Sequence, residues 1–153
     1  MNSGSSHNLP VGLTRLIDAG VWPGTSGPSM NQQHLKPIVS EDRVRLFAPD
    51  ESLICLQPPP FHTIADEVNN GGAGDFWSRF GSLKQIVPGD ALVIGDFGLG
   101  SDSPVVLDFS RDKVNPPVLR LRWESDGPNT RTMWVQGARN FDEFAQMLGL
   151  KAS

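Results

Sequence analysis

Cys55 and His62 are the residues whose types could supply a nucleophile and a base. A cysteine thiolate attacks an electrophile when a neighbouring base removes its proton, and a third group then orients that base. The sequence shows no such third group, and Cys55 stands between the apolar residues Ile54 and Leu56. A cysteine in a buried strand behaves as a small apolar side chain. We therefore expect a structural role for Cys55. No Gly-x-Ser-x-Gly motif supports serine hydrolysis either.

Four aspartates between positions 96 and 112 could be imagined around a cation: Asp96, Asp102, Asp108 and Asp112. Their spacing does not match a calcium loop, and we expect them on different strands and turns. Asp96 also begins an Asp-Phe-Gly tripeptide, but the Gly-rich loop, strand lysine and catalytic loop that accompany this motif in protein kinases are missing. No two histidines stand at metal-ligand spacing. The sequence therefore predicts no catalytic, metal or cofactor site.

The elements that must position these groups are clearest between Ala91 and Leu150. A short apolar run breaks at Gly95, and three later segments alternate apolar with other residues, as strands do. The alternating residues are Val105, Leu107 and Phe109, then Leu119, Leu121 and Trp123, then Met133 and Val135. Asp, Asn, Gly and Pro fill the connections, so a meander of antiparallel strands is the simplest topology.

One amphipathic helix follows the strands. Asn140 can cap it, with Glu143 three residues later where a capping-box partner belongs. A stripe of apolar residues follows at helical spacing, made of Phe141, Phe144, Ala145 and Leu148. Gly149 then ends the helix and Leu150 can fold back on it. The sequence thus predicts an α+β fold, an antiparallel sheet with helices packed on one face, closed by a C-terminal amphipathic helix.

The first ninety residues are less regular. Apolar spacing predicts a short helix from Gly12 to Ala19, and Thr63 can cap another over Ile64 to Val68. Asp75 can cap a third. A turn at Pro49 and Asp50 predicts a pair of strands around it, which would contain five apolar residues: Val44, Leu46, Leu53, Ile54 and Leu56. We expect residues 1–10 to be a disordered tail and residues 11–153 to be a single domain.

Composition and charge narrow the class of protein. The net charge of −4 and the pI near 5.2 argue against direct binding of nucleic acid or an anionic membrane. The single cysteine permits no internal disulfide, and no apolar run approaches the roughly 20 residues of a membrane span. We expect a soluble cytoplasmic protein without a cofactor.

The sheet residues that point away from the predicted core are the candidates for binding. If Leu119, Leu121 and Trp123 face the core, Arg120 and Arg122 face the other way. Alternation could place Asp108 and Trp134 on that same exposed face. Arg and Trp are both enriched at interface hot spots. Asp108, Arg120, Arg122 and Trp134 are therefore our protein-binding candidates, although a solvated face with an Arg stacked on Trp and paired with Asp is the simpler explanation of the pattern.

The run ALVIGDFGLGSDSPVVLDFSRDKVNPPVLRLRW, followed by WVQGARNFDEFAQMLGL, resembles the C-terminal half of the SUKH superfamily, which includes the Smi and Knr cell-wall-assembly regulators. The similarity spans Ala91 to Leu150, and the N-terminal region departs from the family pattern. The resemblance implies an α+β fold and a non-enzymatic role in protein binding. Many bacterial members are thought to act as immunity proteins that neutralise a toxin, while fungal relatives act as regulators.

We therefore expect a non-enzymatic module that binds a protein partner, such as a basic toxin, or that acts as a regulatory scaffold. The alternative is a small enzyme or ligand-binding domain with a polar site in the loops from Gly95 to Asp112. A domain with a structural or housekeeping partner is a third possibility. The sequence does not fix the oligomeric state.

Overall fold

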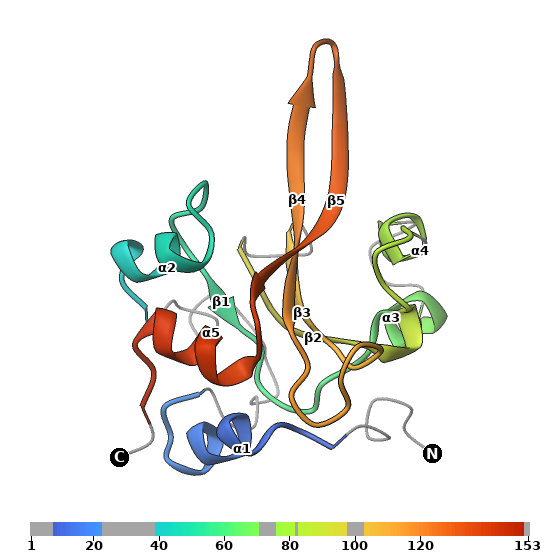
Figure 1. Ribbon diagram of the computed structural model, residues 1–153. Helices are drawn as coiled ribbons and strands as arrows, with labels where there is room; N and C mark the ends of the chain where they lie inside the picture. The colour runs from blue at the N-terminus through green and yellow to red at the C-terminus, as the bar shows by residue number, and fades with distance from the viewer. Residues whose placement is uncertain (1–7, 23–38, 71–75, 82, 98–102, 152–153) are drawn as a thin grey trace.

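The computed structural model of the chain describes residues 8–22, 39–70, 76–81, 83–97 and 103–151. In these residues a five-stranded antiparallel sheet lies between two groups of helices (Figure 1). The predicted α+β class, antiparallel sheet and C-terminal helix are confirmed. The expected cap at Asp75 and most of the predicted tail lie outside the described residues.

The strands follow one another across the sheet in chain order, so the predicted meander is confirmed. Their bounds are β1 Cys55–Leu56, β2 Ala91–Asp96, β3 Pro104–Asp108, β4 Val118–Asp126 and β5 Asn129–Ala138. The register of the pairing between β2 and β3 shifts between Val93 and Gly95. A Cβ atom on Gly95 would lie 3.0 Å from the backbone oxygen of Cys55. β2 continues past Gly95 and pairs there with β1.

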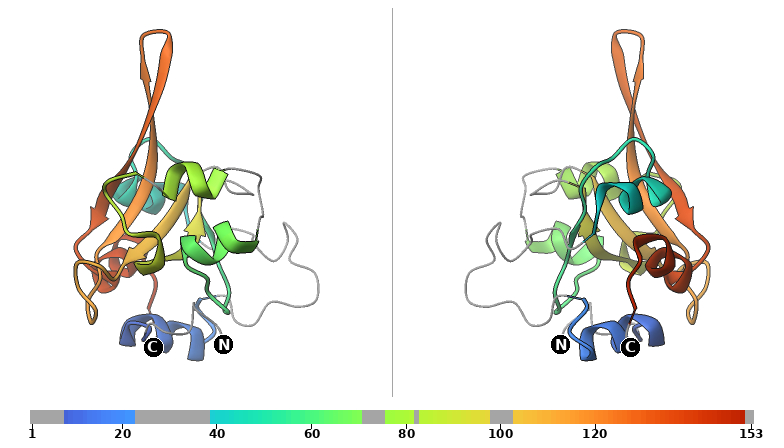
Figure 2. Two further views of the ribbon diagram at one scale, coloured as in Figure 1. Left: turned by 90° about the vertical axis from the view of Figure 1, so that its right-hand side faces the viewer. Right: turned by 90° about the vertical axis from the view of Figure 1, so that its left-hand side faces the viewer.

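Helices cover both faces of the sheet (Figures 1 and 2). One face carries α1 (Val11–Asp18), α2 (Glu41–Phe47) and α5 (Phe141–Leu148), and the other carries α3 (Ile64–Asn70) and α4 (Phe76–Gly81). A short 3₁₀ helix, Pro88–Asp90, leads into β2. The first face has a buried cluster that includes Leu16, Phe47, Leu107, Phe141 and Phe144. The second has a smaller one that includes Ile64, Phe80, Leu119, Leu121 and Trp134. We predicted helices on one face of the sheet only. This part of the prediction is wrong, because α3 and α4 pack on the second face.

The segment before the turn at Pro49 and Asp50 is the helix α2, so the predicted first strand of that pair is wrong. Val44 and Phe47 stand three residues apart and are both buried, whereas Leu46 is 58% exposed. Helical spacing therefore decides which residues reach the core. Glu41 and Asp42 occupy the first turn, where the helix dipole favours negative charge.

The two short helices predicted at Gly12–Ala19 and Ile64–Val68 are confirmed as α1 and α3, although α1 lies one residue earlier at each end and α3 continues to Asn70. Leu13 and Leu16 of α1 are buried, and Gly20 follows with φ +75°. At α3 the Thr63 hydroxyl accepts a hydrogen bond from the Asp66 N–H at 3.1 Å. The Asp66 carboxylate accepts one from the Thr63 N–H at 2.9 Å. This reciprocal pair satisfies two backbone donors at the start of the helix.

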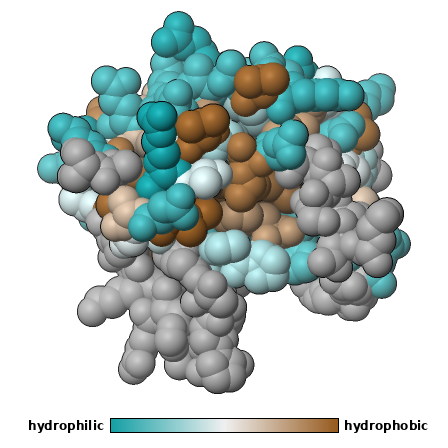
Figure 3. All heavy atoms as spheres, turned by 90° about the horizontal axis from the view of Figure 1, so that it is seen from below, coloured by the Kyte–Doolittle hydropathy of each residue, from teal (hydrophilic) through white to brown (hydrophobic). Residues whose placement is uncertain are grey.

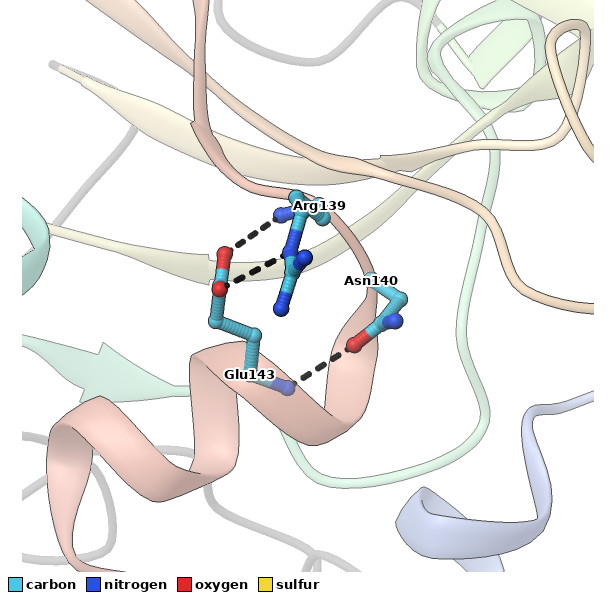
Figure 4. A network of polar contacts seen from close by, with 3 residues as sticks. All are labelled: Arg139, Asn140 and Glu143. Carbon is cyan, nitrogen blue, oxygen red and sulfur yellow. Dashed lines mark hydrogen bonds and ion pairs between the residues drawn. The ribbon is translucent and has the colours of Figure 1, made fainter.

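The start of α5 differs from the predicted capping box in one bond (Figure 4). Asn140 Oδ1 accepts from the Glu143 N–H at 2.9 Å, as expected. The Glu143 carboxylate instead accepts from the N–H and the Nε of Arg139, at 2.8 and 3.0 Å. At the other end Gly149 has φ +75° and Leu150 N donates to the Ala145 carbonyl, which confirms the predicted Schellman end.

Candidate functional site: the β4–β5 hairpin

β4 and β5 form a hairpin that projects beyond the rest of the protein (Figures 1 and 2). β3 pairs with β4 only from Val118 to Arg120, while β4 and β5 stay paired as far as Asp126 and Asn129. Gly127, with φ +64°, takes the first position of the two-residue turn, as a type II′ hairpin turn requires. From Arg122 to Asp126 the hairpin extends about 13 Å, at about 3.3 Å per residue.

The hairpin offers backbone groups as well as side chains. In the part of the chain that the structure describes, no strand pairs with the outer edge of β4 beyond Arg120, or with that of β5. The Gln85 side chain accepts a hydrogen bond from the Trp134 N–H at 3.3 Å and so covers one position of the β5 edge. Because a lone two-stranded hairpin is marginally stable in water, this one gains from any contact along its length.

The two tryptophans of the hairpin lie on one face but differ in burial. Leu121 pairs with Trp134 and Trp123 pairs with Thr132, so both rings point to the face of α3 and α4. Trp134 is buried, and its Nε1 donates to the Phe80 carbonyl at 2.9 Å. Trp123 is 43% exposed and meets the Phe80 ring edge-on, with centroids 5.2 Å apart. Trp123 is thus held on one side and accessible on the other.

The opposite face carries charged residues at the base of the hairpin. Arg120 is buried, with its Nη2 atom 2.7 Å from Asp50 Oδ1 and its guanidinium carbon 5.7 Å from the centre of the Phe97 ring. Burial acts to raise the pKa of Asp50, but the hydrogen bond and charge of Arg120 outweigh it, so that pKa lies below its ordinary value. The charge of Arg122, which is exposed, acts in the same direction.

Glu51 belongs to the same cluster and responds in the opposite way. Burial and the neighbouring Asp50 charge raise the pKa of Glu51, while Arg120 opposes the rise. The Nη1 atom of Arg120 is buried and has no hydrogen-bond partner within the described ranges. Asp50 is therefore the carboxylate that compensates this buried cation.

The four predicted interface residues do not share one exposed face. Asp108, Arg120 and Trp134 are buried, and only Arg122 is exposed. Trp134 lies on the face opposite to Arg120 because it pairs with Leu121. Asp108 accepts from the N–H and hydroxyl of Ser110 and forms an ion pair with Arg111, so it holds the turn after β3. The predicted placement is wrong for these three residues, and their contact with a partner stays a prediction.

The described acidic residues of the alternative site, in the loops from Gly95 to Asp112, hold turns. Asp96 accepts from the Ser103 N–H at 3.5 Å. Asp112 accepts from the N–H groups of Asn115 and Val114, which lower its pKa. Asp102 lies outside the described residues. Among those described, no three His, Cys, Asp or Glu residues gather as metal ligands.

Cys55 is buried in β1, and burial together with the charge of Asp96 raises the pKa of its thiol. A raised pKa disfavours the thiolate that a nucleophile needs. His62, the suggested base, is exposed. These positions accord with the structural role that the sequence suggested for Cys55.

Trp123 is the exposed aromatic residue that the sequence analysis assigned to the core. Its alternation with Arg122 correctly grouped it with Leu119 and Leu121 on one face. The turn signal at Gly127 and Pro128 indicates how far the two strands run before they reverse. β4 is longer than β3, so its far end has no neighbouring strand on that side. This difference in strand length was the signal that could have placed Trp123 beyond the core.

Comparison with models of protein families, with curated proteins and with solved structures finds no match for this chain. None of the described helices has the length and apolar character needed to cross a membrane. The assignment of a function therefore depends on the residues and on their geometry.

Proposed function

We propose that this protein is a non-enzymatic protein-binding module and that the β4–β5 hairpin is the element that meets the partner. The main support is the position of Trp123, which is 43% exposed at the base of a projecting hairpin while Phe80 fixes one side of its ring. A ring held in place loses little conformational freedom on binding, and Trp is the residue most enriched at interface hot spots.

Arg122 adds a second contact on the other face of the hairpin. It is exposed, and its charge acts on Asp50 at the base of the hairpin. A partner that surrounds the hairpin would therefore meet an aromatic residue on one face and a guanidinium on the other. The strand edges add backbone donors and acceptors, as in complexes where a peptide extends a sheet.

A more specific form of this proposal concerns the partner. The resemblance to the SUKH superfamily favours an immunity or regulatory role. The net charge of −4 favours encounter with a basic protein such as a toxin nuclease, because complementary charge raises association rates. A toxin gene beside the gene for this protein would support the immunity form, whereas a metabolic gene cluster would favour the alternative of a small enzyme or ligand-binding domain.

Site-specific crosslinking tests the hairpin directly. A photoreactive phenylalanine analogue at position 123 should capture the partner in the source cell. The same analogue at Leu46, which is 58% exposed on α2, is the matched control and should capture it far less. Equal capture from both positions would contradict a role for the hairpin.

A shortened hairpin gives a second test. Replacing Trp123 to Thr132 with Asn-Gly joins Arg122 to Met133, which already pair across the hairpin, through a favoured two-residue turn and leaves Trp134 and its contact with Gln85 in place. We expect this variant to keep its circular dichroism spectrum and cooperative unfolding and to lose the partner. Recovery of the partner by the shortened, folded protein would count against the proposal.

A further inference from the structure

A groove of about 710 Å³ lies between α1, α2 and α5, at the end of the protein away from the hairpin. Its floor is apolar and comes from Leu16, Phe141, Ala145 and Leu150, all buried or nearly so. Seen from below, apolar residues gather in the middle of this side with hydrophilic residues around them (Figure 3).

Cations predominate among the charged residues that line the groove. Arg15, Arg43 and Lys151 carry three positive charges, and Asp142 carries one negative charge. The groove thus has a local charge of +2 in a chain whose net charge is −4. None of the ion pairs among the described residues involves these three cations.

The positive charge gathers near the C-terminal end of α5. A Cβ atom on Gly149 would lie 3.3 Å from Arg43 Nε, so the Arg43 side chain lies across this residue. Lys151 follows two residues later, whereas Asp142 lies at the other end of α5, beside Gly12 of α1. The partial negative charge at the end of α5 accounts for a cation at Arg43. Arg15 lies in the last turn of α1, where the dipole of that helix favours a cation in the same way.

We propose that this groove binds an acidic segment of a protein partner, with apolar side chains on the floor and carboxylates near Arg43 and Lys151. The volume lies within the usual range of binding sites. At about 1.5 Å per residue, the eight residues of α5 give the groove a length of about 12 Å, which suits two turns of a helical peptide. This surface is separate from the hairpin and does not depend on the function proposed for it.

Fluorescence anisotropy with synthetic peptides tests the assignment. The probe is a labelled peptide of about ten residues, composed of Glu and Leu at helical spacing, and the controls replace every Glu with Gln or with Lys. We expect the full-length protein to bind the Glu peptide at least about tenfold more tightly than either control. We also expect the difference to shrink as salt is added.

Charge reversal locates the binding site. Arg43→Glu and Lys151→Glu should each weaken binding of the Glu peptide about fivefold or more. Lys84→Glu, an equal charge change at an exposed position outside the groove, is the matched control and should leave binding unchanged. Circular dichroism confirms that each variant is folded. Sedimentation of the protein alone shows whether a second copy fills the groove, which would overturn the proposal.

Two further results would overturn it. One is binding of the Glu peptide no tighter than that of the Gln peptide, and the other is equal weakening by Arg43→Glu and Lys84→Glu. The variant with the shortened hairpin should bind the Glu peptide normally. Its result separates a failure of this proposal from a failure of the hairpin proposal.

Discussion

Arg120 and Asp50 form an ion pair in which only the cation is buried. The Nη2 and Oδ1 atoms are 2.7 Å apart, and the side chains are 5% and 45% exposed, respectively. Arg120 lies near the start of β4, and Asp50 follows α2 in the chain. The pair therefore ties the base of the hairpin to the helix layer on one face of the sheet.

Asp50→Asn should lower the free energy of unfolding by about 1–3 kcal/mol, because it leaves a buried guanidinium without its counter-charge. The loss stays below that for a fully buried pair because water reaches Asp50. Since the pKa of Asp50 is lower in the folded protein, its contribution is complete above the unfolded pKa of about 3.9 and disappears as pH falls through the folded pKa.

Urea unfolding of wild type and Asp50→Asn from neutral to acid pH measures this contribution. The difference between the two proteins should shrink at the acid end. Asp18→Asn, at the exposed end of α1, is the control and should change the stability little at either pH. A difference that grows on acidification would contradict the assigned role of the pair.

The two tryptophans of the hairpin should separate stability from binding. Trp134→Ala should cost about 3–5 kcal/mol of stability, because it empties a buried site and leaves the Phe80 carbonyl without its donor. Trp123→Ala should cost about 1 kcal/mol, since that ring is 43% exposed. Thermal melts compare them, and similar losses from both would refute the difference in burial.

The cap at the start of α5 should stabilise the fold measurably. Asn140→Ala removes the acceptor for the Glu143 N–H and should lower the free energy of unfolding by about 1 kcal/mol. Ser40→Ala is the matched control, because Ser40 precedes α2 without a side-chain capping bond. Chemical denaturation should show almost no change for that control. If Ser40→Ala lost as much stability as Asn140→Ala, the loss in Asn140→Ala would not come from the capping hydrogen bond.

Gly137 permits β5 to approach α2. A Cβ atom there would overlap the ring of Phe47, so Gly137→Ala should lower the free energy of unfolding by about 1–3 kcal/mol. Gly89→Ala places its methyl group where no atom lies within 4 Å and should be nearly neutral. Equal melting temperatures for the two variants would show that the Phe47 ring moves aside at no cost.

Local signals sufficed for the C-terminal helix and for the order of the strands. Asn140, the apolar stripe from Phe141 to Leu148, and Gly149 each act within a few residues of chain, so their effect can be predicted without the rest of the fold. The turn residues between strands act equally locally. By contrast, the spacing of Val44 and Leu46 predicted a strand, and burial of Val44 and Phe47 on one face of α2 shows a helix instead.

Alternation along β4 correctly separated Arg120 and Arg122 from Leu119 and Leu121, because successive side chains of a strand point to opposite faces. It could not show which face meets water. Helices distant in the sequence cover both faces, and the pairing of Trp134 with Leu121 sets it opposite to Arg120. The sequence by itself determined which residues of a strand share a face. Only the tertiary structure decided that Trp134 is buried and Trp123 exposed, because burial depends on which distant elements pack at each point.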